Sequence, residues 1–459
     1  MAKVKNRRKR IIAWTVVGAI FGVILIAVGI HMIRWAVHSK TAESYGEYVF
    51  AEEKEKYSPA VSAIWSDASK QGFLDLFPSI TIDENAESVK IMQIADPQIK
   101  FGSWTRDTKT MDLLDRAIKA EQPDICVVTG DLTLSVFTYD AFKYFADFME
   151  ERKQPWAFVY GNHDSQFDCS KYTIWKLLRK YEYCLFQRGA SDIYGESNYL
   201  VNVFKGDKKA ENLVYSLVML DSGMYPEAEN VALTDWVYDW IHQSQMDWYE
   251  WAICGLKNIK SDIQTSMYFH IPIKEFADMY YLNEQSKGNQ IPDNVAESLT
   301  DKGIDTSYVH DVKGVVRESD KKDTEYVYGD EGYTVGIFYQ GNAEGVTDHP
   351  DVFKYIKDLG STKALFCGHD HVNTLKGYYD GVYLGYGLCC GYHTYPFFDK
   401  ENFLTKLFGL SDKVLYNGDL WTDEEGNKME KGVTVINVNV TSIGYGALNV
   451  VDRPNSYYK

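Results

Sequence analysis

Carboxylate, amide and imidazole side chains follow directly after five short apolar runs of the sequence. A single residue of this kind is more often a helix cap, a turn former or a solvated side chain. As an ordered set they have the composition of a site for Mn, Fe or Zn, because a shared carboxylate can hold two such ions close together. The set consists of Asp96, Gln98, Asp131, Asn162, His163, Asp164, His270, His369 and His371.

The apolar runs are predicted strands, and they alternate with predicted helices. Such alternation predicts an α/β protein whose functional loops lie at the carboxyl ends of strands, which is where each polar motif stands. Glycines beside the motifs, Gly130, Gly161 and Gly368, let the backbone turn sharply and approach an ion closely. We predict strands at 89–94, 125–129, 156–160, 198–203, 213–220, 264–269, 364–367, 381–385, 433–440 and 447–451, and helices at 58–76, 111–121, 141–153, 245–256 and 352–359.

The N-terminal segment is basic and is followed by an uncharged run at 11–30. Twenty helical residues rise about 30 Å, which is the thickness of a bilayer core. Six basic residues precede the run and only Arg34 and Lys40 follow it closely, so we expect a cytoplasmic N-terminus and an extracytoplasmic body at the cell membrane. A cleaved signal peptide and a buried core helix remain the alternatives.

Composition narrows the classes of protein further. The net charge is −17, although residues 1–40 hold eight basic and no acidic side chains. The body is therefore acidic, which disfavours binding of nucleic acid through a basic patch. A chain that is 45% hydrophobic and 25% charged is neither disordered throughout nor a multi-span membrane protein. Seven cysteines argue against a disulfide-stapled small domain and leave a Cys169–Cys184 pair open.

In chain order the motifs read D-x-Q, G-D, G-N-H-D, H and G-H-x-H. This series resembles the calcineurin-like metallophosphoesterase superfamily over about residues 89–395. The segments 368–373 and 384–387 are similar to the small purple-acid-phosphatase-like enzymes of plants and fungi. The resemblance implies an α/β (α+β) metallophosphoesterase fold, with a central β-sandwich flanked by helices. It also implies two metal ions at one edge, and hydrolysis of phosphate esters by hydroxide held between them.

The predicted organisation has four parts. A cytoplasmic tail at 1–10 and a transmembrane signal anchor at 11–33 come first. A stalk or packing extension at 34–88 follows. The phosphoesterase domain occupies 89–459 and has an insertion at about 280–349, which we expect to shape substrate choice.

The resemblance also implies a role for each residue. Asp131 takes the place of the carboxylate that bridges the two ions, and His163 faces the substrate with Asp164 orienting it. Asn373 and His393 are weaker candidates for contacts around the ions or the substrate. Asp96, Gln98 and His371 would complete one metal site, and Asn162, His270 and His369 the other.

Two positions depart from the family pattern. Gln98 stands where most members have histidine, so the first metal site is expected to bind more weakly or to choose a different ion. Leu134 stands where the purple enzymes have the tyrosine that gives their colour. The protein is therefore not expected to be purple, and Mn, Fe and Zn all stay open.

The sequence thus predicts a membrane-anchored phosphoesterase with a phosphomonoester or phosphodiester substrate and no nucleic-acid partner. One alternative is a phosphodiesterase acting on lipid or envelope-polymer head groups. An alternative of a different class is a metal-stabilised binding module without catalysis.

Overall fold

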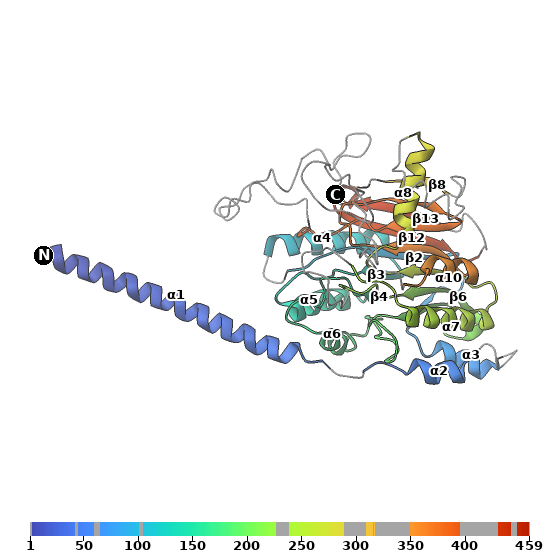
Figure 1. Ribbon diagram of the computed structural model, residues 1–459, viewed down its shortest axis with the longest axis horizontal. Helices are drawn as coiled ribbons and strands as arrows, with labels where there is room; N and C mark the ends of the chain where they lie inside the picture. Colours follow the sequence, from blue (N-terminus) through green and yellow to red (C-terminus); the bar gives the residue numbers. More distant parts are fainter. Residues whose placement is uncertain are drawn as a thin grey trace.

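Two mixed sheets with helices on their outer faces make up the body (Figure 1). The computed structural model describes residues 2–41, 45–58, 65–100, 104–225, 238–288, 309–314, 316, 349–394, 430–441 and 448–458. The strands in these ranges are β1 (Ser79–Ile82), β2 (Ser88–Ile94), β3 (Ile125–Thr129), β4 (Trp156–Val159), β5 (Tyr199–Lys205), β6 (Leu213–Met219), β7 (Thr265–Tyr268), β8 (Val309–Lys313), β9 (Thr362–Cys367), β10 (Lys376–Tyr379), β11 (Val382–Tyr386), β12 (Gly432–Asn439) and β13 (Leu448–Pro454). The helices are α1 (Ala2–His38), α2 (Phe50–Lys56), α3 (Asp67–Leu74), α4 (Trp104–Glu121), α5 (Thr138–Glu151), α6 (Lys171–Leu178), α7 (Gln243–Ile259), α8 (Glu275–Ser286) and α10 (Val352–Leu359), with short 3-10 helices at η1 (Ala210–Asn212) and η3 (Asn455–Tyr458).

The smaller sheet has the order β13-β12-β2-β3-β4, and β2, β3 and β4 run parallel within it. The larger sheet has the order β1-β5-β6-β7-β9-β11-β10-β8, with β6, β7, β9 and β11 parallel. Val127 of β3 and Met219 of β6 belong to one buried cluster, so the two sheets share a core. The predicted central β-sandwich flanked by helices is therefore confirmed.

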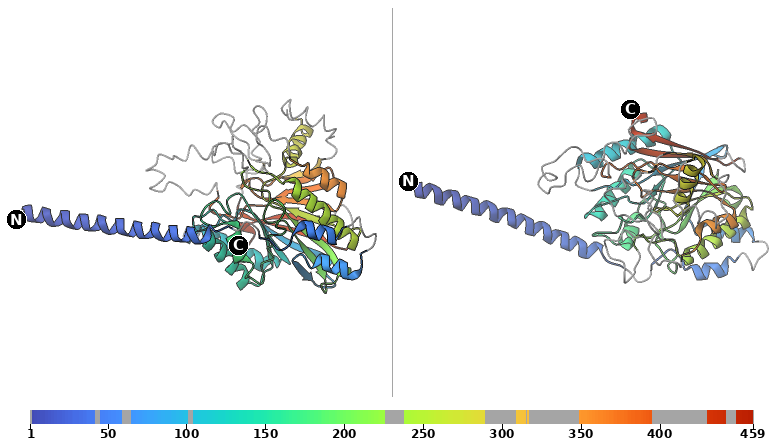
Figure 2. Two further views of the ribbon diagram at one scale, coloured as in Figure 1. Left: turned by 60° about the horizontal axis from the view of Figure 1, so that its bottom comes forward. Right: turned by 45° about the horizontal axis from the view of Figure 1, so that its top comes forward.

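The side chains of β6 show how the layers are built. Leu217 and Met219 join the core between the sheets, whereas Val218 joins a separate apolar core with Ile253 of α7. Successive side chains of a strand point to opposite faces, so a nearly continuous apolar run marks a strand buried on both sides. Helices α3, α7 and α10 cover the larger sheet, and α4 and α5 cover the smaller one (Figures 1 and 2).

The described residues between 45 and 88 contact the body. Strand β1 pairs in parallel with β5, which extends the larger sheet by one strand. Trp65 and Phe73 are buried, and the ring of Phe73 lies 5.1 Å from that of Trp251 on α7. Of the two readings of this segment, the packing extension is therefore the one that the contacts favour.

The predicted insertion at 280–349 is described only in part. Helix α8 covers its beginning, and β8 pairs antiparallel with β10 at the edge of the larger sheet. The rest, and with it the expected role in substrate choice, lies outside the described residues. All seven cysteines are free thiols, including Cys169 and Cys184.

Helix α1 projects away from the body in every view (Figures 1 and 2). Its segment Trp14–His38 is long and apolar enough to cross a membrane, as membrane anchors and signal sequences both are. None of this segment's most apolar window is buried, which argues against the alternative of a core helix.

Candidate metal centre

Strands from both sheets end at one edge of the sandwich, and every residue of the predicted site follows one of them. Parallel strands of one sheet bring their carboxyl ends together, and the shared core places the ends of the two sheets side by side. Asp96 and Gln98 follow β2, Asp131 follows β3, Asn162, His163 and Asp164 follow β4, His270 follows β7, and His369 and His371 follow β9.

One group, called here the first cluster, consists of Asp96, Gln98 and His371. Nε2 of His371 lies 3.5 Å from Oδ1 of Asp96 and 3.1 Å from the amide nitrogen of Gln98. All three side chains are buried or nearly so. The main-chain amide of His369 donates to both carboxylate oxygens of Asp96, at 3.1 and 3.2 Å, which fixes the orientation of that carboxylate.

The second cluster consists of Asn162, His270 and His369. Oδ1 of Asn162 lies 3.0 Å from Nε2 of His270 and 3.0 Å from Nδ1 of His369. Nδ1 of His270 lies 2.8 Å from the carbonyl oxygen of Thr129, which can only accept, so Nδ1 carries the proton. Nε2 of His270 therefore presents a lone pair to the cluster, as a metal-ligating histidine does.

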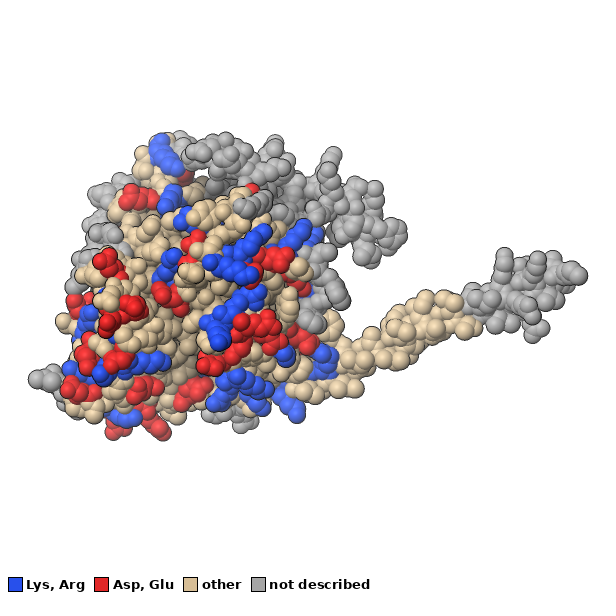
Figure 3. Space-filling model, turned by 180° about the vertical axis from the view of Figure 1, so that it is seen from behind, with Lys and Arg blue, Asp and Glu red and all other residues tan. Residues whose placement is uncertain are grey.

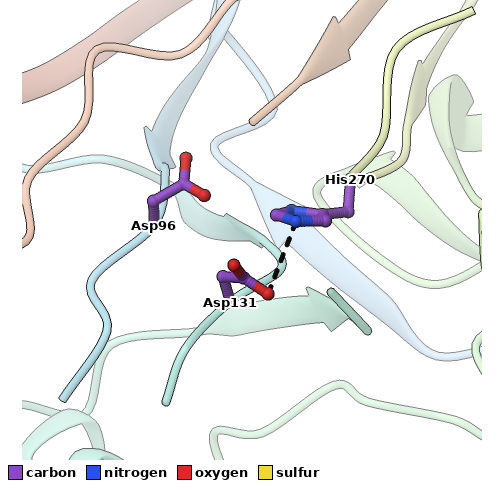
Figure 4. Close-up of side chains that lie close together, drawn as sticks. All are labelled: Asp96, Asp131 and His270. Atoms are coloured by element: carbon purple, nitrogen blue, oxygen red, sulfur yellow. Dashed lines mark ion pairs between the residues drawn. The ribbon is translucent and has the colours of Figure 1, made fainter. Parts of the chain in front are cut away.

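The carboxylate of Asp131 lies between the two clusters. Oδ1 is 3.4 Å from Nε2 of His270, and Oδ2 is 3.3 Å from the amide nitrogen of Gln98. Asp96, Asp131 and His270 bring ligand atoms within 4.8 Å of one another, and their side chains converge in Figure 4. One oxygen for each cluster is the arrangement that a bridging carboxylate requires.

The backbone that carries these side chains is strained and tightly packed. Asp96, Gln98, Asp131 and His369 have φ between 42° and 76°, a region that non-glycine residues adopt at a cost of about 1–3 kcal/mol each. A Cβ on Gly161 would lie 2.2 Å from the amide nitrogen of Asp131, so only glycine allows the two loops to approach. Gly161 therefore serves the close packing of the loops that carry Asp131 and Asn162.

Burial sets the charge state of the two facing carboxylates. The pKa of Asp96 is well above its ordinary value, because burial and then the neighbouring Asp131 disfavour its charge. Burial also acts to raise the pKa of Asp131, but the imidazoles of His270 and His163 outweigh it and bring this pKa to about 2. Two buried carboxylates this close are both charged only when a cation accompanies them.

Burial disfavours the charged form of the histidines in both clusters. Burial lowers the pKa of His270, and it lowers those of His369 and His371 well below the ordinary value. A metal ion binds the neutral form of imidazole. Lone pairs of His270, Asn162 and Asp131 thus converge without a proton to share, and this donor set fits a metal ion.

His163 differs from the clustered residues in its exposure. Its side chain is 24% exposed, with Nδ1 2.8 Å from Oε1 of Gln166 and Nε2 3.8 Å from Oδ2 of Asp131. The partner of its ring is therefore Gln166 and not Asp164, which corrects the expected role of Asp164. The buried carboxylate of Asp164 instead accepts the main-chain amides of Gly161, at 2.7 Å, and Thr133, at 3.1 Å.

The two weaker candidates have partners of their own. Nε2 of His393 lies 2.9 Å from Oδ1 of Asp107 on α4. Asn373 is buried, and its main-chain amide donates to the carbonyl of Asp370 at 2.9 Å. His393 thus joins the loop after β11 to α4, and Asn373 lies in the loop after β9.

Three residues beside the clusters were missed from the sequence. Lys431 is buried, donates to Sγ of Cys389 at 3.3 Å and adds positive charge near the first cluster. The ring of Tyr238 lies 4.4 Å from that of His369, and the hydroxyl of Tyr225 accepts from the amide of Asn162 at 3.3 Å. No sequence motif marks these three positions, because only the fold brings their side chains close to the two clusters.

Comparison with known proteins agrees with the geometry. Residues 89–251 match the family model of the calcineurin-like phosphoesterases, a range that begins at β2 and ends within α7. A protein of Arabidopsis thaliana named probable inactive purple acid phosphatase 28 is 26% identical over 74% of this chain and 79% of its own length. Probable inactive purple acid phosphatase 29 of the same plant is 28% identical over 67% and 72%, respectively.

Two further similarities are weaker. Phosphatase DCR2 of Saccharomyces cerevisiae is 25% identical over 62% of this chain and 44% of the yeast protein. A solved dimetal phosphatase from Danio rerio superposes over 81% of this chain and 97% of its own, with 11% identity and a TM-score of 0.41. Residues 89–251 thus match the calcineurin-like phosphoesterase family, and the chain is similar to purple-acid-phosphatase-like proteins of plants.

Proposed function

We propose that this protein hydrolyses phosphate esters with two metal ions, one in each cluster, and that Asp131 is their shared ligand. The observation that carries the proposal is the division of the Asp131 carboxylate, which turns one oxygen to each cluster. When bound, ions such as Mn, Fe or Zn supply an acidified water near neutral pH and positive charge for the oxygens of the phosphoryl group. This local charge also lets an acidic body accept an anionic substrate.

Side chains of the protein supply proton transfer and hold the site in place. His163 lies beside Asp131 and is partly exposed, so it can meet the substrate and give a proton to the leaving oxygen. Asp164 ties together the loops that carry Asp131 and Asn162 through the amides of Thr133 and Gly161. It is therefore a positioning residue and not a proton donor.

A binding module without catalysis is the second candidate. Two observations favour it: the plant relatives are named as probably inactive, and Gln98 replaces a histidine of the family pattern. The yeast relative is named a phosphatase, and the two clusters are otherwise complete. We therefore favour catalysis.

The place of action that we propose is the outer side of a membrane. Helix α1 would span the bilayer with the basic residues before it in the cytoplasm, and the body would lie outside. The substrate would then be an extracytoplasmic phosphomonoester or phosphodiester, with lipid or envelope-polymer head groups as one class.

The test is metal-dependent hydrolysis by the full chain in detergent. The protein is stripped of metal, resupplied with Mn, Zn or Fe, and assayed on a nitrophenyl phosphomonoester and the corresponding diester. We expect activity to return with metal, and the ratio of the two rates to decide between phosphatase and phosphodiesterase.

Asp131→Asn is the matched variant for this assay. Its amide cannot offer one charged oxygen to each cluster, so metal content and hydrolysis should fall together to background. Full activity in this variant would contradict the shared-ligand assignment. Stoichiometric metal binding by the parent protein without hydrolysis of either ester would favour the binding module.

A further inference from the structure

Helix α1 ends in contact with the body at the first residues of two helices. Arg34 forms an ion pair with Asp140, and the ring of His38 stacks on Tyr139 at 4.3 Å, both near the start of α5. The main-chain amide of Ser170, which caps α6, donates to the carbonyl of His38 at 3.0 Å. Figure 1 shows α1 meeting the body beside these two helices.

This contact lies on the same edge of the body as the metal centre. Helix α5 follows β3 and Asp131, and α6 follows β4 and Asn162. In a strand–loop–helix unit the helix begins near the carboxyl end of its strand. The end of α1 therefore reaches the edge on which both clusters stand.

Exposed apolar side chains gather on the two loops between the clusters and α1. Val136 is 46% exposed and Phe137 37%, on the loop from Asp131 to α5, and Phe167 is 43% exposed, on the loop from His163 to α6. The ring of Phe137 also lies 6.0 Å from that of His31 on α1. Apolar side chains at a loop tip favour insertion into a membrane interface.

The apolar surface of α1 indicates that a bilayer lies at the edge of the body that this helix contacts. The 25 residues of Trp14–His38 rise about 37 Å and expose apolar side chains all round. Figure 3 shows a long stretch of α1 in tan, without charged side chains. The charged residue of this segment, Arg34, lies at its end against the body. A bilayer around α1 would end where the helix meets α5 and α6, at the level of the exposed loop residues.

We propose that the edge carrying the metal centre faces the bilayer that holds α1, with Val136, Phe137 and Phe167 in its interface, and that the substrates are phosphate esters of lipids in that bilayer. The orientation stands on the contacts of α1 and on the exposed loops. The substrate class rests in addition on the proposed phosphoesterase function. Two experiments test the orientation and the substrate class separately.

The first experiment measures orientation without using activity. The full-length variant Val136→Cys carries an environment-sensitive fluorophore and is reconstituted in phosphatidylcholine vesicles, with some lipids brominated along their chains. We expect a blue-shifted emission that the brominated lipids quench. Tyr457→Cys, at a position 56% exposed on η3, is the matched control and should show neither effect. Equal quenching at both positions, or none at Val136, would overturn the orientation.

The second experiment compares one headgroup in two physical forms. The substrates are phosphatidic acid, a monoester, and phosphatidylglycerol, a diester, each as long-chain lipid in phosphatidylcholine vesicles and as a short-chain monomer. The double variant Val136→Ser, Phe167→Ser should lose roughly tenfold on the vesicle form, because two apolar side chains no longer enter the interface. Its rate on the monomer should match that of the parent protein, and Tyr457→Ser should change neither.

Each other outcome has a definite meaning. Equal loss on both forms, or no loss on either, would overturn the proposal on substrate class. Hydrolysis of nitrophenyl esters without hydrolysis of either lipid would overturn it as well. If the parent protein hydrolyses no ester at all, the proposed function fails, and the fluorophore at residue 136 still decides the orientation.

Discussion

The main chain and the side chain of His163 both contact Asp131, in different ways. The amide of His163 donates to Oδ1 of Asp131 at 2.9 Å, while ring Nε2 lies 3.8 Å from Oδ2 of the same carboxylate. The backbone of His163 thus helps to fix the carboxylate that both clusters share. Its ring stays on the open side of the site, so a side-chain substitution leaves the structural contact in place.

We therefore expect His163→Gln to lower turnover by roughly 100-fold or more while metal content stays near that of the parent protein. The reason is that proton transfer or charge stabilisation is lost, whereas the amide still holds Asp131. Metal analysis and steady-state kinetics on one preparation check this. His310→Gln, which removes a histidine with a 47% exposed side chain on β8, is the control and should leave both quantities unchanged. Loss of metal in His163→Gln would contradict the separation of roles.

The strand-end motifs were the most informative part of the sequence. Short apolar runs before Asp131 and Asn162 correctly marked buried strands, because strands covered on both faces read as continuous apolar segments. Ordered polar residues after such strands had to meet at one edge. The sharing of Asp131 between two clusters came from the family resemblance and not from the spacing of residues.

Contacts that depend on how a loop turns back were not predictable. Asp164 is next to His163 in sequence, yet its carboxylate binds the amides of Gly161 and Thr133. Lys431 is more than three hundred residues from Asp96 and follows no motif. Strand β1 is only four residues long, and its pairing with β5 gives no local sequence signal.

Substitution of Gln98 tests the departure from the family pattern. The amide nitrogen of Gln98 faces His371 at 3.1 Å and Asp131 at 3.3 Å, and rotation of the amide would present its oxygen in the same place. Gln98→His offers an imidazole nitrogen instead, which is a better ligand for Zn or Fe, so these metals should bind the first cluster more tightly. Competition with a chelator during metal titration measures this. Unchanged affinity would mean that Gln98 is not a ligand.

Asp164→Asn tests the positioning role. Each carboxyl oxygen of Asp164 accepts one main-chain amide, and the substitution replaces one of these oxygens with an NH2 donor, so the hold on the loops of Asp131 and Asn162 weakens. Metal affinity should fall about 10–100-fold, as it does when groups that orient ligands are removed. Asp168→Asn is a close control, because Asp168 lies on the same loop as Asp164, between β4 and α6. Its buried carboxylate accepts the main-chain amide of Thr138, the first residue of α5, at 2.8 Å. Equal loss of metal affinity in both variants would indicate general damage to the loop.

Glu196 should make stability depend on pH. Burial, and then repulsion from Asp221, raise the pKa of Glu196 from 4.5 to about 8 in the folded chain. Between these values the folded state holds a proton that the unfolded state has lost, so the free energy of unfolding falls as pH rises through this range. Glu196→Gln stays neutral and should be more stable than the parent protein at about pH 8, by about 1–3 kcal/mol. The two should be similar near the lower pKa. Denaturant unfolding across this pH range measures the effect, and Glu211→Gln, at an exposed position, is the control. If Glu196→Gln kept the pH dependence of the parent protein, the assignment would be contradicted.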